Sequence, residues 1–60
     1  DKLKIGQTLP QVEALLGKPH EQILISDSSN PGEQLWIYFI NQKSLQLSFQ
    51  NFQLFKIEEL

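Results

Sequence analysis

The sequence predicts an α+β fold in which a short N-terminal helix forms a layer on an antiparallel β-meander of three or four strands. Two observations predict it. Apolar residues recur at helical spacing near the start of the chain, and from residue 22 onward they follow strand-like patterns separated by short turns. The 60 residues suit a single domain spanning 1–60. The chain has no cysteine, so its apolar core must provide the stability that disulfides give many small domains.

The helix is expected over residues 9–16. Thr8 is a favourable N-cap, and Gln11 follows it at the spacing of a capping box. Gly17 suits the left-handed position that ends many helices, and Pro19 prevents the helix from continuing. The stripe expected to face the core consists of Leu9, Val12, Leu15 and Leu16. The structural residues of the whole motif are Gly6, Thr8, Gly17 and Pro19.

Three segments then have the composition of strands. Residues 22–25 are rich in β-forming side chains, and residues 26–32 after them are rich in turn formers, which predicts a flexible hairpin connection. Residues 35–40 are apolar on both faces, as in a central strand. Residues 45–50 alternate between apolar and polar side chains. Their inward residues are expected to be Leu45, Leu47 and Phe49, with Gln46, Ser48 and Gln50 in solvent.

The last predicted strand is residues 53–57. Regular alternation would place Phe55 and Ile57 on one side and Leu54 and Lys56 on the other. The turn before it reads Asn51-Phe52, and phenylalanine is strained at the positive φ that a tight two-residue turn requires. We therefore expect a longer loop, with Phe52 at least partly exposed.

Charge and composition exclude several classes of function. The net charge is −2, and the five basic residues are dispersed lysines, so no nucleic-acid footprint is present. The apolar runs are too short to cross a membrane. The single histidine, His20, adjoins Glu21, but neighbours in an extended segment point to opposite faces and do not form an acid–base pair. We expect no enzymatic activity, no cofactor and no metal site.

The aromatic residues of the central strand are the candidate binding site. Trp36 and Tyr38 share a face opposite Leu35, Ile37 and Phe39. If the helix covers the Leu35 face, these two aromatics form an exposed patch for a protein partner, with Phe52 as a third anchor. The alternative is that loop residues or the chain termini cover Trp36. The edges of residues 22–25 and 54–57 could also pair with another chain, as a homodimer or a domain swap.

The ordered motifs together resemble a known family. Ile5-Gly6-x-Thr8 opens the helix, Leu16-Gly17-x-Pro19 closes it, and Trp36-x-Tyr38 marks a strand after a variable loop. The strand pair Leu45-x-Leu47-x-Phe49 and Leu54-x-x-Ile57 completes an order similar to that of the SmpA/OmlA (BamE) domain family, over nearly the whole chain. The resemblance implies a helical layer on an antiparallel sheet and a non-catalytic docking role in outer-membrane assembly. Two departures are the absence of a lipidated cysteine and the Asn51-Phe52 turn in place of Asn/Asp-Gly.

Two functional hypotheses follow. The first is an envelope scaffolding domain similar to the BamE family. The second is a stand-alone inhibitor or immunity-type module of the same fold, since the architecture is also similar to one repeat of the β-lactamase inhibitor protein. The chain begins at Asp1, so we expect a processed segment that a signal peptide or lipid-bearing cysteine could precede. The first hypothesis implies the periplasm or the inner face of the outer membrane, with any membrane association through that lipid. The second allows the cytoplasm.

Overall fold

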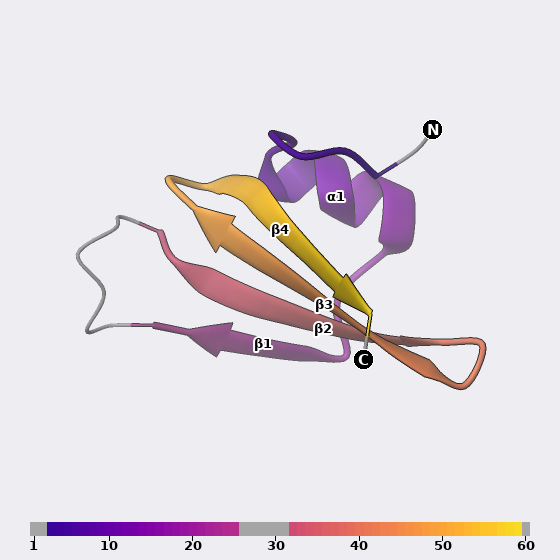
Figure 1. The fold of residues 1–60 in the computed structure, drawn as a ribbon. Coiled ribbons are helices and arrows are strands. Elements are labelled where there is room, and N and C mark those ends of the chain that lie inside the picture. Colours follow the sequence, from indigo (N-terminus) through magenta and orange to yellow (C-terminus); the bar gives the residue numbers. More distant parts are fainter. Residues whose placement is uncertain (1–2, 26–31, 60) are drawn as a thin grey trace.

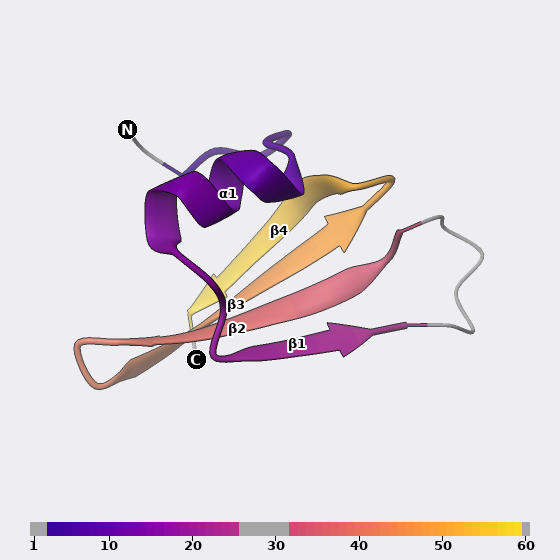
Figure 2. The same cartoon turned by 180° about the vertical axis from the view of Figure 1, so that it is seen from behind.

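The computed structural model describes residues 3–25 and 32–59 and confirms an α+β architecture (Figure 1). Within these residues, one helix packs on a four-stranded antiparallel sheet whose strands lie in sequence order. The elements are α1 (Leu9–Leu16), β1 (Glu21–Leu24), β2 (Gln34–Ile40), β3 (Lys43–Gln50) and β4 (Gln53–Glu59). The hairpin connection predicted over residues 26–32 lies outside the described residues, apart from Gly32. Figure 2 shows α1 across the β3–β4 side of one sheet face, with β1 at the far edge.

The local signals predicted the bounds of α1 correctly. Thr8 is the N-cap, and its backbone N–H donates to Gln11 Oε1 at 2.9 Å, which is one half of the capping box. At the other end Gly17 has φ +80°, and its N–H donates to the carbonyl oxygen of Glu13 at 2.7 Å. The helix is therefore closed at both ends by residues that the sequence had identified.

The apolar stripe of α1 is narrower than predicted. Val12 is fully buried, and Leu9 and Leu16 pack against the core around it. Leu15 is exposed, so its assignment to the core was wrong. At about 100° per residue, Leu9 and Leu16 lie on one side of Val12 and Leu15 on the other, and the helix turns only the first side toward the sheet. The helix therefore contributes three residues to the packing, and not four.

The register of the sheet determines which face is covered. In β2 and β3, Trp36 lies opposite Leu47 and Tyr38 opposite Leu45, so these four side chains share the helix-facing side. The core cluster among the described residues consists of Val12, Trp36, Tyr38, Leu47, Phe49 and Leu54. The inward assignment of Leu45, Leu47 and Phe49 is thus confirmed. Ser48 was expected in solvent but is buried on the opposite face, where its cross-strand neighbours are Leu35 and Lys56.

A β-bulge changes the alternation of β4. Phe49 pairs with Leu54 and Ser48 with Lys56, so Phe55 is an extra residue without a partner on β3. Leu54 and Ile57 consequently lie on the same side of the sheet, opposite Phe49 and Leu47. The predicted separation of these two residues onto different faces was wrong, because regular alternation assumes an uninterrupted ladder.

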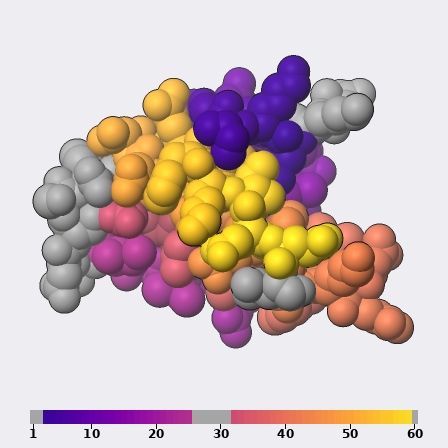
Figure 3. Space-filling view, in the orientation of Figure 1, coloured from indigo at the N-terminus to yellow at the C-terminus, as the bar shows by residue number. Residues whose placement is uncertain are grey.

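The N-terminal segment pairs with the beginning of β4. The Gly6 N–H donates to the carbonyl oxygen of Leu54 at 2.7 Å, and the Leu54 N–H donates to that of Gln7 at 2.7 Å. Thr8 forms an isolated bridge with Gln53. Figure 3 shows the N-terminal segment against β4 on the molecular surface. This contact fixes the start of α1 over the end of the sheet.

Both tight hairpins use two residues at positive φ. Asn41 and Gln42 connect β2 to β3, and Asn51 and Phe52 connect β3 to β4 with φ values of 53° and 62°. The longer loop expected at Asn51-Phe52 was therefore wrong, whereas the exposure of Phe52 is confirmed. The ring of Phe52 lies against Gly32, so closely that a Cβ added there would be 2.7 Å from it. This contact holds Phe52 in a conformation that bulky residues rarely adopt.

We expect Val12→Ala to lower the free energy of unfolding by about 2 kcal/mol, because it removes buried methyl groups and leaves a cavity. Leu15→Ala, on the exposed side of the same helix, should cost less than about 1 kcal/mol. Urea unfolding of the two variants measures the difference. Equal losses would contradict the packing of α1 described above.

Phe52→Ala and Phe52→Gly should separate the strain of the turn from the ring contact with Gly32. Both variants lose the ring, but only glycine relieves the positive φ, so the glycine variant should be more stable by about 1 kcal/mol. Thermal unfolding of both proteins tests this. An alanine variant as stable as the glycine variant would show that the turn is unstrained.

Candidate functional site

The structure buries the two aromatic residues expected to form the exposed patch. Trp36 is 4% exposed and Tyr38 is 1% exposed, with ring centroids 6.4 Å apart in the core. The helix covers their face of β2, and not the Leu35 face that the patch hypothesis required. The premise of that hypothesis was therefore wrong: Trp36 is covered, and by the helix layer rather than by the loop residues or chain termini of the alternative.

The polar atom of Trp36 is satisfied inside the domain. Its indole Nε1 donates to the side-chain oxygen of Gln34 at 2.7 Å, and Gln22 Nε2 on β1 donates to the same oxygen at 2.9 Å. Gln34 is itself buried. Gln34 lies two residues before Trp36 on β2, so the two side chains share one face of the sheet. This spacing is visible in the sequence, but it did not enter the prediction of the site. Gln34 thus joins β2 to Gln22 of β1 and at the same time satisfies the indole of Trp36.

Tyr38 connects the sheet to the end of the helix. Its hydroxyl donates to the carbonyl oxygen of Gly17 at 2.8 Å, which satisfies an acceptor that the helix leaves open. Burial, and then the negative charge of Glu13, raise the pKa of Tyr38 above its ordinary value of 10.0. The hydroxyl is therefore a neutral donor in the folded protein over the whole neutral range.

The third candidate lies apart from the other two. Phe52 is exposed in the β3–β4 turn, outside the core cluster, and packs on Gly32. Of the residues named as structural, Thr8 and Gly17 bound α1 as predicted, and Gly6 at φ +100° pairs with Leu54. Pro19 follows in the connection to β1. No single site unites the aromatic candidates.

The exposed apolar surface lies on the opposite side of the sheet from α1. On β1 and β2, Ile23 pairs with Leu35, and Ile37 and Phe39 follow on the same face. Phe39 is 52% exposed and Ile23 is 45% exposed, while Leu35 and Ile37 are half-buried. We call these four residues, Ile23, Leu35, Ile37 and Phe39, the outer patch. Their neighbours on β3 are the uncharged residues Ser44, Gln46 and Ser48.

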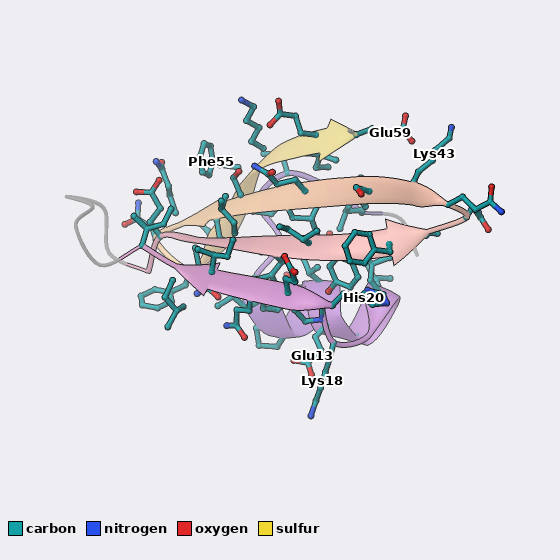
Figure 4. The ribbon with its side chains drawn as sticks, turned by 90° about the horizontal axis from the view of Figure 1, so that it is seen from below. Glu13, Lys18, His20, Lys43, Phe55 and Glu59 are labelled. Carbon is teal, nitrogen blue, oxygen red and sulfur yellow. The ribbon has the colours of Figure 1, made fainter. Side chains whose placement is uncertain are left out.

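The patch hypothesis had placed Leu35, Ile37 and Phe39 beneath the helix, and Ile23 had been considered only as part of a pairing edge. The signal was present, since residues 35–40 are apolar on both faces and one eight-residue helix covers only one of them. Figure 4 shows Phe55 of β4 also on the side of the sheet away from α1. No element formed by the described residues covers the outer patch.

His20 supports one end of the outer patch. Its ring Nδ1 accepts a hydrogen bond from the backbone N–H of Phe39 at 3.2 Å, and the backbone N–H of His20 donates to the carbonyl oxygen of Ile37 at 2.9 Å. The rings of His20 and Phe39 meet edge to face at 5.2 Å. His20 thereby extends the β1–β2 pairing by one step beyond Glu21. Its observed contacts position Phe39.

Two shallow depressions lie elsewhere. One, of about 350 Å³, is lined by Glu13, Lys18, Pro19, Gln22 and Trp36, between α1 and β1. Glu13 and Lys18 project away from the sheet in Figure 4. The other, of about 250 Å³, lies beside the β2–β3 turn and is lined by Ile40, Asn41, Lys43, Ser44, Leu45 and Glu59. In the part of the chain that the structure describes, no three His, Asp or Glu side chains gather as a metal site.

Comparison with known proteins gives no relative from which a role could be transferred. No family model, curated protein or solved structure matches the chain. Among the described residues, no helix is long and apolar enough to span a membrane.

The buried hydroxyl of Tyr38 should make stability sensitive to alkaline pH. Because its pKa is raised on folding, the contribution of this group is intact below pH 10.0 and is lost as the pH rises above that value. Tyr38→Phe should remove this component of the decline, while losing about 1 kcal/mol at neutral pH with the Gly17 hydrogen bond. Urea unfolding across the alkaline range compares the two proteins. Since Tyr38 is the chain's one tyrosine, phenolate absorbance gives an independent titration. Parallel alkaline profiles would contradict the assignment.

Proposed function

We propose that this chain is a non-catalytic protein-interaction domain that binds a partner protein through the outer patch. The observation that carries the proposal is the uncovered apolar surface of Ile23, Leu35, Ile37 and Phe39 on a sheet whose other face packs against α1. Contiguous exposed apolar surface on a small domain is characteristic of interaction sites.

The surroundings of the outer patch support a protein partner. Ser44 and Gln46 lie beside it on β3 and carry no charge, whereas Glu21 on β1 and Lys56 and Glu58 on β4 lie at its margins. An apolar centre with a polar rim, and with charges displaced to the edge, is the usual composition of a protein interface. The partner expected here is a folded protein with an apolar surface of its own.

The position of Phe39 favours the outer patch over the other surfaces. Phe39 is the most exposed residue of the patch, and His20 holds both its backbone and its ring. A rigid aromatic side chain that loses little freedom on binding is typical of a binding hot spot. Phe52, by contrast, already uses one side of its ring against Gly32.

We further propose that the helix and meander are those of the SmpA/OmlA (BamE) family, with a scaffolding role. The capped helix over Leu9–Leu16 and the Trp36-x-Tyr38 strand occur in the order that this resemblance implies. The alternative remains an inhibitor or immunity-type module of the same fold. The identity of the bound protein would separate them: a component of the envelope assembly machinery supports the first, and an enzyme or toxin inhibited on binding supports the second.

The outer patch is tested by two neighbouring residues of β1. Ile23 belongs to the patch, whereas Leu24, at 69% exposure, points to the helix-facing side. A photo-crosslinking phenylalanine at position 39, introduced in the source organism, would identify the partner, which is then purified for titration calorimetry. Ile23→Ser should weaken binding about tenfold, equivalent to about 1.4 kcal/mol, while Leu24→Ser changes it little.

The same pair distinguishes two modes of binding. If Ile23→Ser and Leu24→Ser weaken the complex equally, the partner contacts the edge of β1 rather than the face of the sheet. If neither changes the affinity at unaltered thermal stability, the outer patch is not the binding surface.

A further inference from the structure

β4 has a free edge beyond its first residues. The backbone groups of Leu54 pair with Gly6 and Gln7, but within the described chain residues 55–59 make no backbone hydrogen bond outside the sheet. These five residues are all exposed, including the apolar Phe55 and Ile57. An edge strand of this kind can pair with another strand.

The register shows which backbone groups are available. A two-residue turn with positive φ values closes on a hydrogen-bonded pair, here Gln50 and Gln53. Every second residue of β3 from Gln50 then directs its backbone groups toward β4, so their partners Lys56 and Glu58 direct theirs toward β3. Ile57, between them, therefore presents its N–H and C=O at the free edge.

The charges around Ile57 are self-complementary. Lys56 and Glu58 both lie on the outer face, opposite Ser48 and Gln46, and their side chains are 3.8 Å apart. In an antiparallel pair centred on Ile57, Lys56 of each chain lies directly opposite Glu58 of the other. The two Ile57 side chains meet on the opposite face. Parallel pairing in register would instead align like charges.

We propose that two copies of the chain pair antiparallel through β4, about a twofold axis at Ile57, and form one continuous eight-stranded sheet. The pairing joins the two outer faces side by side. The proposed dimer does not depend on a partner protein at the outer patch. One pair of short strands buries little surface, so the dimer belongs to the weak, concentration-dependent class.

Other edge pairings fit less well. β1 offers four residues and the single charged side chain Glu21, so pairing of β4 with β1 would leave Glu58 or Lys56 without its counterpart. Such head-to-tail pairing would also continue into open chains and would not close as a dimer. Lysines and bulges often protect edges from association. Here, however, Glu58 provides the opposite charge that Lys56 would meet in the antiparallel pair.

Charge exchange tests the proposal. Sedimentation velocity from about 10 μM to about 1 mM should show a monomer–dimer equilibrium. Lys56→Glu or Glu58→Lys alone places like charges opposite each other and should weaken dimerisation at least tenfold. An equimolar mixture of the two variants should form a heterodimer, because both cross-strand pairs are then complementary. Lys18→Glu, which changes the net charge as Lys56→Glu does but lies outside β4, is the control for that variant and should leave the equilibrium unchanged.

Circular dichroism of each variant should show an unchanged fold, since both side chains are exposed. A protein that stays monomeric over the whole range would overturn the proposal and indicate that Lys56 and the bulge protect the edge. A dimer that neither single variant weakens would also overturn it, and would indicate a domain swap or another surface.

Discussion

One short helix must cover a four-stranded sheet, and this constraint governs the rest of the structure. α1 has eight residues and buries one side chain completely, so it can shield only part of one face. That face receives the largest aromatic side chains of the central strand, Trp36 and Tyr38. Within residues 3–25 and 32–59, no helix or strand covers the apolar residues on the other face. The exposed surface follows from two features of the described residues: β2 is apolar on both sides, and one helix is present to cover it.

Hydrogen bonds inside the covered layer compensate for its small size. A domain of 60 residues buries a smaller share of its surface than a large one, so each connection between elements matters more. Trp36 and Tyr38 combine apolar bulk with one donor each, and both donors are used. The indole donates to Gln34, which also accepts a hydrogen bond from Gln22 on β1, and the phenol ties the end of α1 to the sheet through Gly17. Packing and polar satisfaction therefore come from the same residues.

The sequence predicted what depends on neighbouring residues and missed what depends on pairing. The bounds of α1 followed from Thr8 and Gly17, whose effects are local. The covered face of β2 could not be predicted, because both faces are apolar and the choice depends on the register with β3. The bulge left no signal, since Phe55 suits a strand at any position. Because the covered face of β2 could not be predicted, Phe39 was not singled out as an exposed residue. The exposure of Phe52, by contrast, was predicted.

The bulge also has a consequence for the tolerance of this strand to changes in length. Phe55 has no partner on β3, and the residues before and after it already face their proper sides. Removing it would join Leu54 to Lys56 in a regular ladder and leave every other side chain of β4 on its present face. Removing Ile57 or Glu58, beyond the bulge, would instead turn at least one neighbouring residue of β4 to the opposite face. Related chains can therefore differ by one residue at this point and keep the same core.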